Sequence, residues 1–121
     1  MMVGIASVAR AQPSSKVLAT LDCTLQSREL IVLEISDNKT ARLLSDEGQR
    51  GYADITDAMY TVTFSFAVGS RNHWYLFTVN RYTGSGSMLR SWAFQTKDGA
   101  YKNGFDWPEA MRCVPSMKWK L

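Results

Sequence analysis

The residues best suited to recognise a ligand lie around one turn in the second half of the sequence. The run Asn80–Gly84, reading NRYTG, places an arginine and a tyrosine where a β-rich segment enters a Gly/Ser-rich turn, and Arg90 and Trp92 follow that turn. A guanidinium offers a planar fork of donors to a carboxylate or phosphate, and aromatic rings add stacking surface. We therefore predict a binding surface that includes Arg81, Tyr82, Arg90 and Trp92. In the alternative interpretation, the run only shapes the turn, and its arginine and tyrosine cover the rim of the fold.

Residue types used in catalysis are present but do not form a recognisable set. His73 is the only histidine, and no G-x-S-x-G sequence places a serine on a strained turn. Adjacent carboxylates occur in two places, Asp46-Glu47 and Asp54 with Asp57. Glycosidic acid–base chemistry needs one carboxyl group in apolar and one in polar surroundings, and both pairs lie in polar sequence. We therefore predict no enzyme and no catalytic residue, with an envelope hydrolase that has a shallow polar site as an alternative.

The chain has two cysteines, Cys23 and Cys113, so a disulfide has only one possible connectivity. Such a bond would stabilise the fold by roughly 4 to 5 kcal/mol in the chain-entropy model. Two buried free thiols in a cytoplasmic protein are the alternative. Cysteines this far apart, with one histidine, lack the closely spaced ligand pairs of structural zinc sites, so we predict no metal and no cofactor.

The first residues of the chain look like part of an export signal. Residues 1–11 read MMVGIASVARA, an apolar run that ends in the small-x-small pattern Ala9-Arg10-Ala11. We interpret them as the end of a truncated secretory signal peptide, the alternative being an N-terminal extension without function. Residues 12–16 are then a flexible lead-in, residues 17–116 a single β domain and residues 117–121 a basic tail. An exported chain reaches the periplasm or the exterior, where disulfides form.

Composition limits the domain count and the partners. A length of 121 residues accommodates one domain, and a hydrophobic share of 45% fills one core. The net charge of +3 is scattered, without the basic stripe of a nucleic-acid-binding protein. The charge pattern neither indicates nor excludes a polyanion such as a cell-surface polysaccharide. We predict a monomer without a transmembrane segment in the mature chain.

Hydrophobic alternation with a period of two identifies the strands. It predicts strands over residues 16–25, 30–36, 40–44, 60–68, 73–82, 88–94 and 111–114. Turns are predicted at 37–39, 69–72, 83–87 and 98–99, and a loop at 103–108. Seven or eight short strands with hairpin spacing predict an all-β protein, a small antiparallel barrel or sandwich. Because Cys23 lies on the apolar face of the first strand, the disulfide is expected to join the first and last strands.

Two family resemblances follow from these features. Cys23 followed by a hairpin, the N/D-R-x-T-G run Asn80–Gly84 and Cys113 resemble small exported proteobacterial β proteins with no assigned activity, over most of residues 17–114. A weaker similarity, through Leu21-Asp22-Cys23 and the hairpin 30–44, is to the periplasmic inhibitors of c-type lysozyme. Those β-barrels carry a Ser-Gly-x-x-Tyr loop, but here Ser85-Gly86 is followed by Leu89 at the tyrosine position, so no inhibitory residue is transferred.

The leading functional hypothesis is a non-enzymatic periplasmic or cell-envelope binding protein for an unknown protein or envelope component. It depends on the absence of a recognisable catalytic set beside one distinctive turn. A lysozyme-inhibitor-like protein and an envelope hydrolase are the alternatives.

Overall fold

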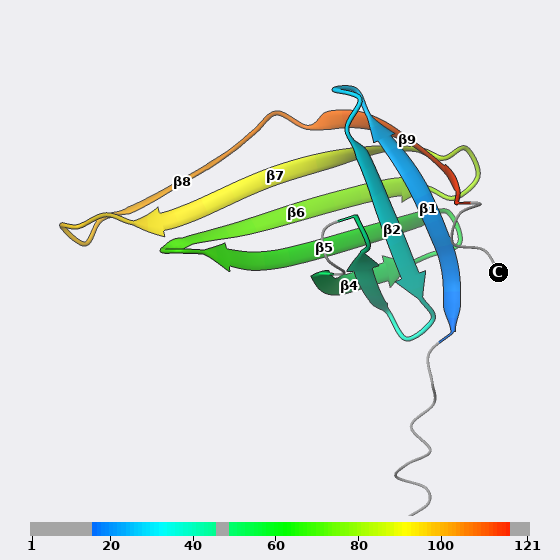
Figure 1. Ribbon diagram of the computed structural model, residues 1–121, viewed down its shortest axis with the longest axis horizontal. Helices are drawn as coiled ribbons and strands as arrows, with labels where there is room; N and C mark the ends of the chain where they lie inside the picture. The colour runs from blue at the N-terminus through cyan, green and yellow to red at the C-terminus, as the bar shows by residue number, and fades with distance from the viewer. Residues whose placement is uncertain (1–15, 46–48, 117–121) are drawn as a thin grey trace, which may run out of the picture.

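The regular structure of this protein consists of β-strands throughout the part that the computed structural model describes, residues 16–45 and 49–116 (Figure 1). The strands are β1 (Val17–Leu25), β2 (Leu30–Ser36), β3 (Thr40–Leu43), β4 (Gln49–Ile55), β5 (Met59–Val68), β6 (Arg71–Asn80), β7 (Ser85–Gln95), β8 (Tyr101–Phe105) and β9 (Glu109–Pro115). Within these residues there is no helix with the length and apolar content needed to cross a membrane.

Eight of these strands close into an antiparallel barrel. Each of β1 to β7 pairs with the next strand in sequence, β7 also pairs with β9, and β9 pairs with β1. The ninth strand, β8, pairs with the part of β7 that β9 does not reach, and it lies at one end of the strand order. The prediction of a small antiparallel barrel is therefore confirmed, with nine strands in the described residues in place of seven or eight.

The barrel interior is filled by the apolar side of the period-two patterns. Inward-facing side chains alternate with outward-facing ones, because successive residues of a strand point to opposite faces. The largest fully buried side chains come from β1, β2, β3, β5 and β6 and include Leu33, Leu43, Val62, Phe64 and Phe77. The rings of Phe64 and Phe77 meet edge to face, with their centroids 5.8 Å apart. The interior is a packed core.

The disulfide lies on the seam that closes the barrel. Cys23 of β1 stands directly opposite Cys113 of β9, their Cα atoms are 3.9 Å apart, and their sulfur atoms are bonded. Both residues are buried. The predicted connectivity is therefore confirmed, and so is its position between the first and last strands.

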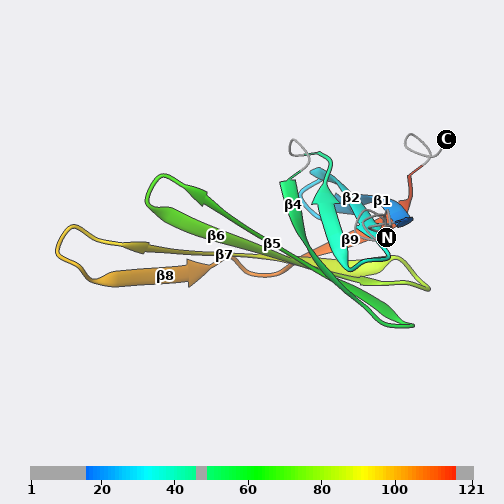
Figure 2. The ribbon, with the colours of Figure 1, turned by 90° about the horizontal axis from the view of Figure 1, so that it is seen from below.

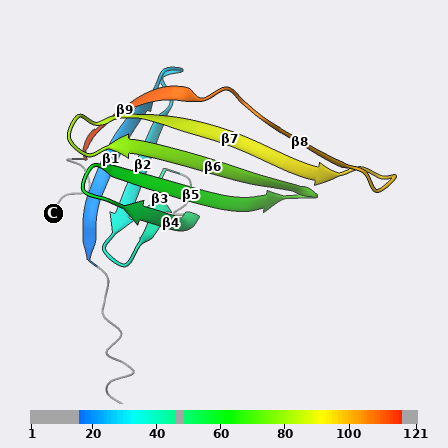
Figure 3. The ribbon, with the colours of Figure 1, turned by 180° about the vertical axis from the view of Figure 1, so that it is seen from behind.

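Three long strands extend beyond the barrel and form an arm with β8. Strands β5, β6 and β7 contain 10, 10 and 11 residues, whereas β3 has only 4. The last β5 residue paired with β4 is Thr63, and the last β7 residue paired with β9 is Met88. We call the remainder, residues 65–75 and 90–106, the arm. Figures 2 and 3 show it projecting from the barrel as a twisted sheet of a single layer.

The structure corrects several predicted boundaries. Strand β4 was not predicted, because its inward positions include Gln49 and Gly51 and give no apolar alternation. Residues 103–105, predicted to begin the loop at 103–108, instead belong to strand β8. The turn predicted over 83–87 is shorter, since β7 begins at Ser85, and the strand predicted over 73–82 is β6 over Arg71–Asn80. Strand β8 has no buried residue, so only its backbone pairing with β7 defines it.

Several predicted features lie outside the described residues. They are the signal-peptide segment 1–11, residues 12–15 of the lead-in, the Asp46-Glu47 pair and the tail 117–121. Lys16 is the first residue described, and its backbone N–H donates to Asp37 at 2.9 Å.

Candidate functional site

The Asn80–Gly84 run forms a tight turn between β6 and β7. The side-chain oxygen of Asn80 accepts hydrogen bonds from the backbone N–H groups of Tyr82 and Thr83 at 2.8 and 3.0 Å. Gly84 has a φ of 79°, and a Cβ there would lie 2.2 Å from the carbonyl oxygen of Cys113. Asparagine and glycine therefore have structural reasons to stand in this run.

Arg81 connects this turn to the neighbouring β4–β5 turn. Its backbone N–H donates to the carbonyl of Ala58 at 2.7 Å, and its guanidinium donates to the carbonyl of Thr56. The same guanidinium lies 4.7 Å from the ring centroid of Tyr60, a cation–π contact. Tyr82, by contrast, is 78% exposed. Arg81 thus holds two turns together at one end of the barrel.

Arg90 and Trp92 lie elsewhere, on the arm. Arg90 stands opposite Tyr75 and Trp92 opposite His73, whereas the β6–β7 pairing next to the turn joins Val79 with Gly86. The structure therefore separates the four predicted binding residues into two places. Arg81 and Tyr82 belong to the turn, and Arg90 and Trp92 belong to the outer half of β7.

On the arm, Arg90 and Trp92 share one face of the sheet with other aromatic and cationic residues. Directly opposite residues in antiparallel strands place their side chains on the same side. The registers of β5 to β8 define what we call the arm face: Phe66, Val68, Arg71, His73, Tyr75, Arg90, Trp92, Phe94 and Lys102. This face continues the one that carries Phe64 and Phe77 inside the barrel.

Ring contacts order the arm face. Phe66 stacks on His73 with centroids 5.2 Å apart and meets Tyr75 edge to face at 5.0 Å. The guanidinium of Arg71 lies 4.7 Å from the centroid of Phe94. These contacts restrict the rotamers of exposed or half-buried side chains, so the face is organised without a ligand.

A shallow hollow of about 350 Å³ lies along this face of the arm. It is lined by Arg71, His73, Tyr75, Arg90, Ser91, Trp92 and Asp106. The backbone N–H of Asp106 donates to the carbonyl of Arg90 at 2.9 Å, at the place where the chain leaves β8 for β9. Positive and aromatic groups therefore surround the hollow, together with one carboxylate.

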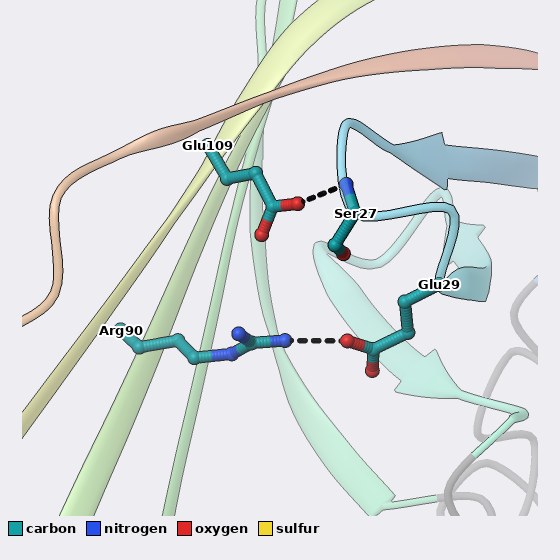
Figure 4. Close-up of polar contacts among 4 residues, drawn as sticks. All are labelled: Ser27, Glu29, Arg90 and Glu109. Carbon is teal, nitrogen blue, oxygen red and sulfur yellow. Dashed lines mark hydrogen bonds and ion pairs between the residues drawn. The ribbon is translucent and has the colours of Figure 1, made fainter.

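Two contacts attach the β1–β2 turn to the base of the arm (Figure 4). Arg90 forms an ion pair with Glu29 at 2.8 Å, and Glu109 accepts a hydrogen bond from the backbone N–H of Ser27 at 2.5 Å. Hydrogen bonds from the side chain and backbone of Ser27, with a further contribution from the positive charge of Arg90, lower the pKa of Glu109 below its usual value. We call these contacts the base contacts.

The opposite face of the arm also carries exposed aromatic side chains. Trp74, Tyr101 and Phe105 alternate with the arm-face residues of their strands and are all exposed. Phe105 meets Trp107, which is 85% exposed, edge to face at 6.1 Å. The arm is thus a single sheet layer with aromatic surface on both sides.

A larger hollow, of about 650 Å³, lies on the outside of the barrel over β2, β3 and β4. Its lining includes Glu34, Arg42, Arg50 and Tyr52. Arg42 and Arg50 stand directly opposite each other, and Arg42 lies 3.8 Å from Glu34. Sequence reasoning gave no signal for this hollow, because β4 itself was not predicted.

The other candidates for chemistry are dispersed. His73 stacks on Phe66, and no group of three metal-ligating side chains occurs among residues 16–45 and 49–116. Asp54 and Asp57 are exposed, and neither lines the two hollows described above. Ser85-Gly86 lies within the sheet, paired with β9, and does not form a protruding loop.

Sequence reasoning missed most of the arm face. Phe66, Arg71, Phe94 and Lys102 were not singled out, although Arg71, His73 and Tyr75 continue the alternation of Phe77 and Val79. That alternation was a usable signal. The contribution of Lys102 was hidden, because its strand was predicted to be largely a loop.

Comparison of the chain with protein-family models, with curated proteins and with solved structures gives no match.

Proposed function

We propose that this protein is a non-enzymatic binding protein of the cell envelope, exported to the periplasm or secreted, and that the arm face is its contact surface. The observation that carries the proposal is the single-layer arm, whose aromatic and cationic face is covered by no other strand of the described chain (Figure 2). A sheet normally buries one apolar face against another layer. Aromatic residues and arginine are also the types enriched at binding hot spots.

The residues first predicted to bind contribute unequally to this proposal. Arg90 and Trp92 lie on the arm face. Arg81 is engaged by Thr56, Ala58 and Tyr60, so we assign it to stability instead. The disulfide is compatible with an oxidising compartment and thereby supports the proposed export.

Two observations favour binding over hydrolysis. The hollows described above each have a single carboxylate in their walls, Glu34 in one and Asp106 in the other, whereas hydrolysis of a glycosidic bond uses a pair. The barrel interior is filled by Val62, Phe64 and Phe77, so the described residues leave no room for a substrate site there.

The structure also gives no support to a lysozyme-inhibiting loop, because Ser85-Gly86 lies within the sheet and pairs with β9.

Photo-crosslinking in intact cells tests the proposed contact surface. A benzophenone amino acid replaces Val68, an exposed arm-face residue, or Tyr82, an exposed residue at the β6–β7 turn, in the exported protein. We expect adducts from position 68 that disappear when Arg71→Glu and Lys102→Glu are added, and none from position 82. Absence of adducts at position 68, or equal adducts at both positions, would remove the arm face as the contact surface.

A further inference from the structure

We infer that the arm face binds a linear acidic polysaccharide, whose sugar rings stack on the aromatic side chains while Arg71 and Lys102 bind its carboxylates. This inference rests on the proposed function, because it names the ligand class of the same surface. Three observations carry it: the position of Trp92, two cations that have no acidic partner among the described residues, and the order of these groups across the strands.

Trp92 lies against the sheet over a glycine. It stands directly opposite Gly104 on β8, and a Cβ at Gly104 would lie 2.6, 2.6 and 3.2 Å from three neighbouring atoms of the indole. A glycine in a strand often marks such a close approach. Because Trp92 also lines the open hollow, it offers aromatic surface to a ligand on the arm face. Trp92 is half-buried, and the part of its ring that borders the hollow suits the C–H face of a sugar.

Two cations flank Phe94 on the same face. Arg71 stands opposite Phe94 from β6, and Lys102 stands opposite it from β8. Both cations are exposed, and the ion pairs found in the described residues are Arg42–Glu34 and Arg90–Glu29. The Arg71 guanidinium is held 4.7 Å from the Phe94 centroid, which orients its planar fork of donors before a carboxylate arrives.

These groups follow one another across the strands. Neighbouring strands lie about 4.8 Å apart, so the row Val68, Arg71, Phe94 and Lys102 spans roughly 14 Å. The adjacent row contains Phe66, His73 and Trp92. A linear polymer lying across the strands would therefore meet a cation, an aromatic ring and a second cation in succession, beside a parallel row of rings.

This arrangement favours a polysaccharide over an acidic peptide. An extended peptide commonly binds by adding a strand to a sheet edge, where main-chain hydrogen bonds supply affinity. Here the aromatic and cationic groups lie on the face of the sheet, spread over β5 to β8, and not along the edge of β8. The ligand that fits them carries its own flat rings and its own negative charges.

Binding of defined polymers to the purified protein tests the ligand class. The probes are an oligogalacturonate, a neutral maltooligosaccharide of equal length and poly-glutamate, measured by calorimetry. We expect the oligogalacturonate to bind with an affinity that falls as salt rises, because exposed charges are screened. The neutral oligosaccharide has no carboxylates for Arg71 and Lys102, and poly-glutamate has no sugar rings to stack on the aromatic side chains. Each should therefore bind at least roughly tenfold more weakly than the oligogalacturonate.

Variants locate the binding. Arg71→Ala with Lys102→Ala should weaken oligogalacturonate binding at least tenfold, whereas Arg112→Ala, which removes an exposed cation on β9, should leave it unchanged. Trp92→Phe keeps an aromatic ring over Gly104 and should weaken binding several-fold. Far-ultraviolet circular dichroism and thermal unfolding of each variant exclude loss of fold as the cause.

Three results would overturn the inference: equal binding of the neutral oligosaccharide, an unchanged affinity in the Arg71 and Lys102 double variant, or tighter binding of poly-glutamate. The last would indicate an acidic polypeptide partner. If none of the polymers binds while position 68 crosslinks in cells, the inferred ligand class is wrong and the arm face remains the proposed contact surface. If position 68 also fails to crosslink, the proposed function falls as well.

Discussion

At the scale of single residues, Arg81 shows how an arginine in a turn can contact a neighbouring turn of the fold. Its guanidinium donates to the carbonyl of Thr56 and lies over the ring of Tyr60. These contacts join the β4–β5 turn to the β6–β7 turn, which are far apart in sequence. An arginine held in this way contributes little to a ligand without giving up contacts that stabilise the barrel.

We predict that Arg81→Ala lowers the free energy of unfolding by about 1 to 2 kcal/mol, through loss of one hydrogen bond and one cation–π contact. Tyr82→Ala is the matched control, because its exposed side chain should change stability by less than about 0.5 kcal/mol. Urea denaturation followed by circular dichroism measures both. Equal stability of the two variants would show that the Arg81 contacts do not stabilise the fold.

At the scale of elements, the base contacts determine how the arm leaves the barrel. Ser27 and Glu29 belong to the β1–β2 turn, whereas Arg90 and Glu109 lie on β7 and β9, where the partner of β7 changes from β8 to β9 (Figure 4). The turn is thereby attached to both sides of the junction. A carboxylate that accepts these bonds is favoured in its charged form, which is why the pKa of Glu109 is lowered.

This lowered pKa predicts a contribution to stability that depends on pH. Since the folded pKa lies below the unfolded one, the contribution is complete above the usual glutamate pKa of about 4.3 and is lost as pH falls through the lower, folded value. Glu109→Gln should therefore be less stable than wild type at pH 7, and the difference should shrink toward zero in acid. Urea denaturation at pH 7 and near pH 3 measures it.

Asp54→Asn, at an exposed carboxylate of β4, is the control for general effects of charge. A stability difference between wild type and Glu109→Gln that is the same at both pH values would contradict the assigned role. So would a pH-dependent difference of equal size in the control variant.

At the scale of the whole molecule, the disulfide and the arm have opposite consequences. The bond between Cys23 and Cys113 fastens the pairing of β1 with β9, without which the sheet would have two more free edges. The arm leaves β8 as an edge and exposes aromatic surface on both faces. The disulfide thus closes the barrel, whereas the arm keeps an edge strand and exposed aromatic side chains.

We predict that Cys23→Ala with Cys113→Ala lowers the free energy of unfolding by roughly 4 to 5 kcal/mol, because the bond closes a chain separation of 90 residues. Reduction of the wild-type protein should give the same loss. Denaturant titration measures both, and mass measurement after alkylation without reductant checks the bond. Two alkylated thiols in freshly exported protein would contradict the assigned disulfide, and an unchanged midpoint would contradict its stabilising role.

The sequence by itself determined the all-β class and the one possible pairing of the cysteines, while the structure shows that the bond is formed and that the sheet closes into a barrel. Val62 and Phe64, or Phe77 and Val79, repeat with a period of two, because each strand buries one face, and this pattern is visible in one segment at a time. With only two cysteines the connectivity had no alternative. The turn at Asp98-Gly99 was likewise readable, since Gly99 has a φ of 89°.

Only the tertiary structure decided where the candidate site lies. Arg71, Phe94 and Lys102 come from three strands, and they share a face because of the registers of β6, β7 and β8. Register is fixed by pairing between segments and by turn geometry, which no single strand reveals. Pairing of Met59 with Asn80 between β5 and β6 likewise brings Arg81 into contact with Thr56 and Tyr60. Local periodicity thus predicted most of the strands, and long-range pairing brought the proposed binding residues together.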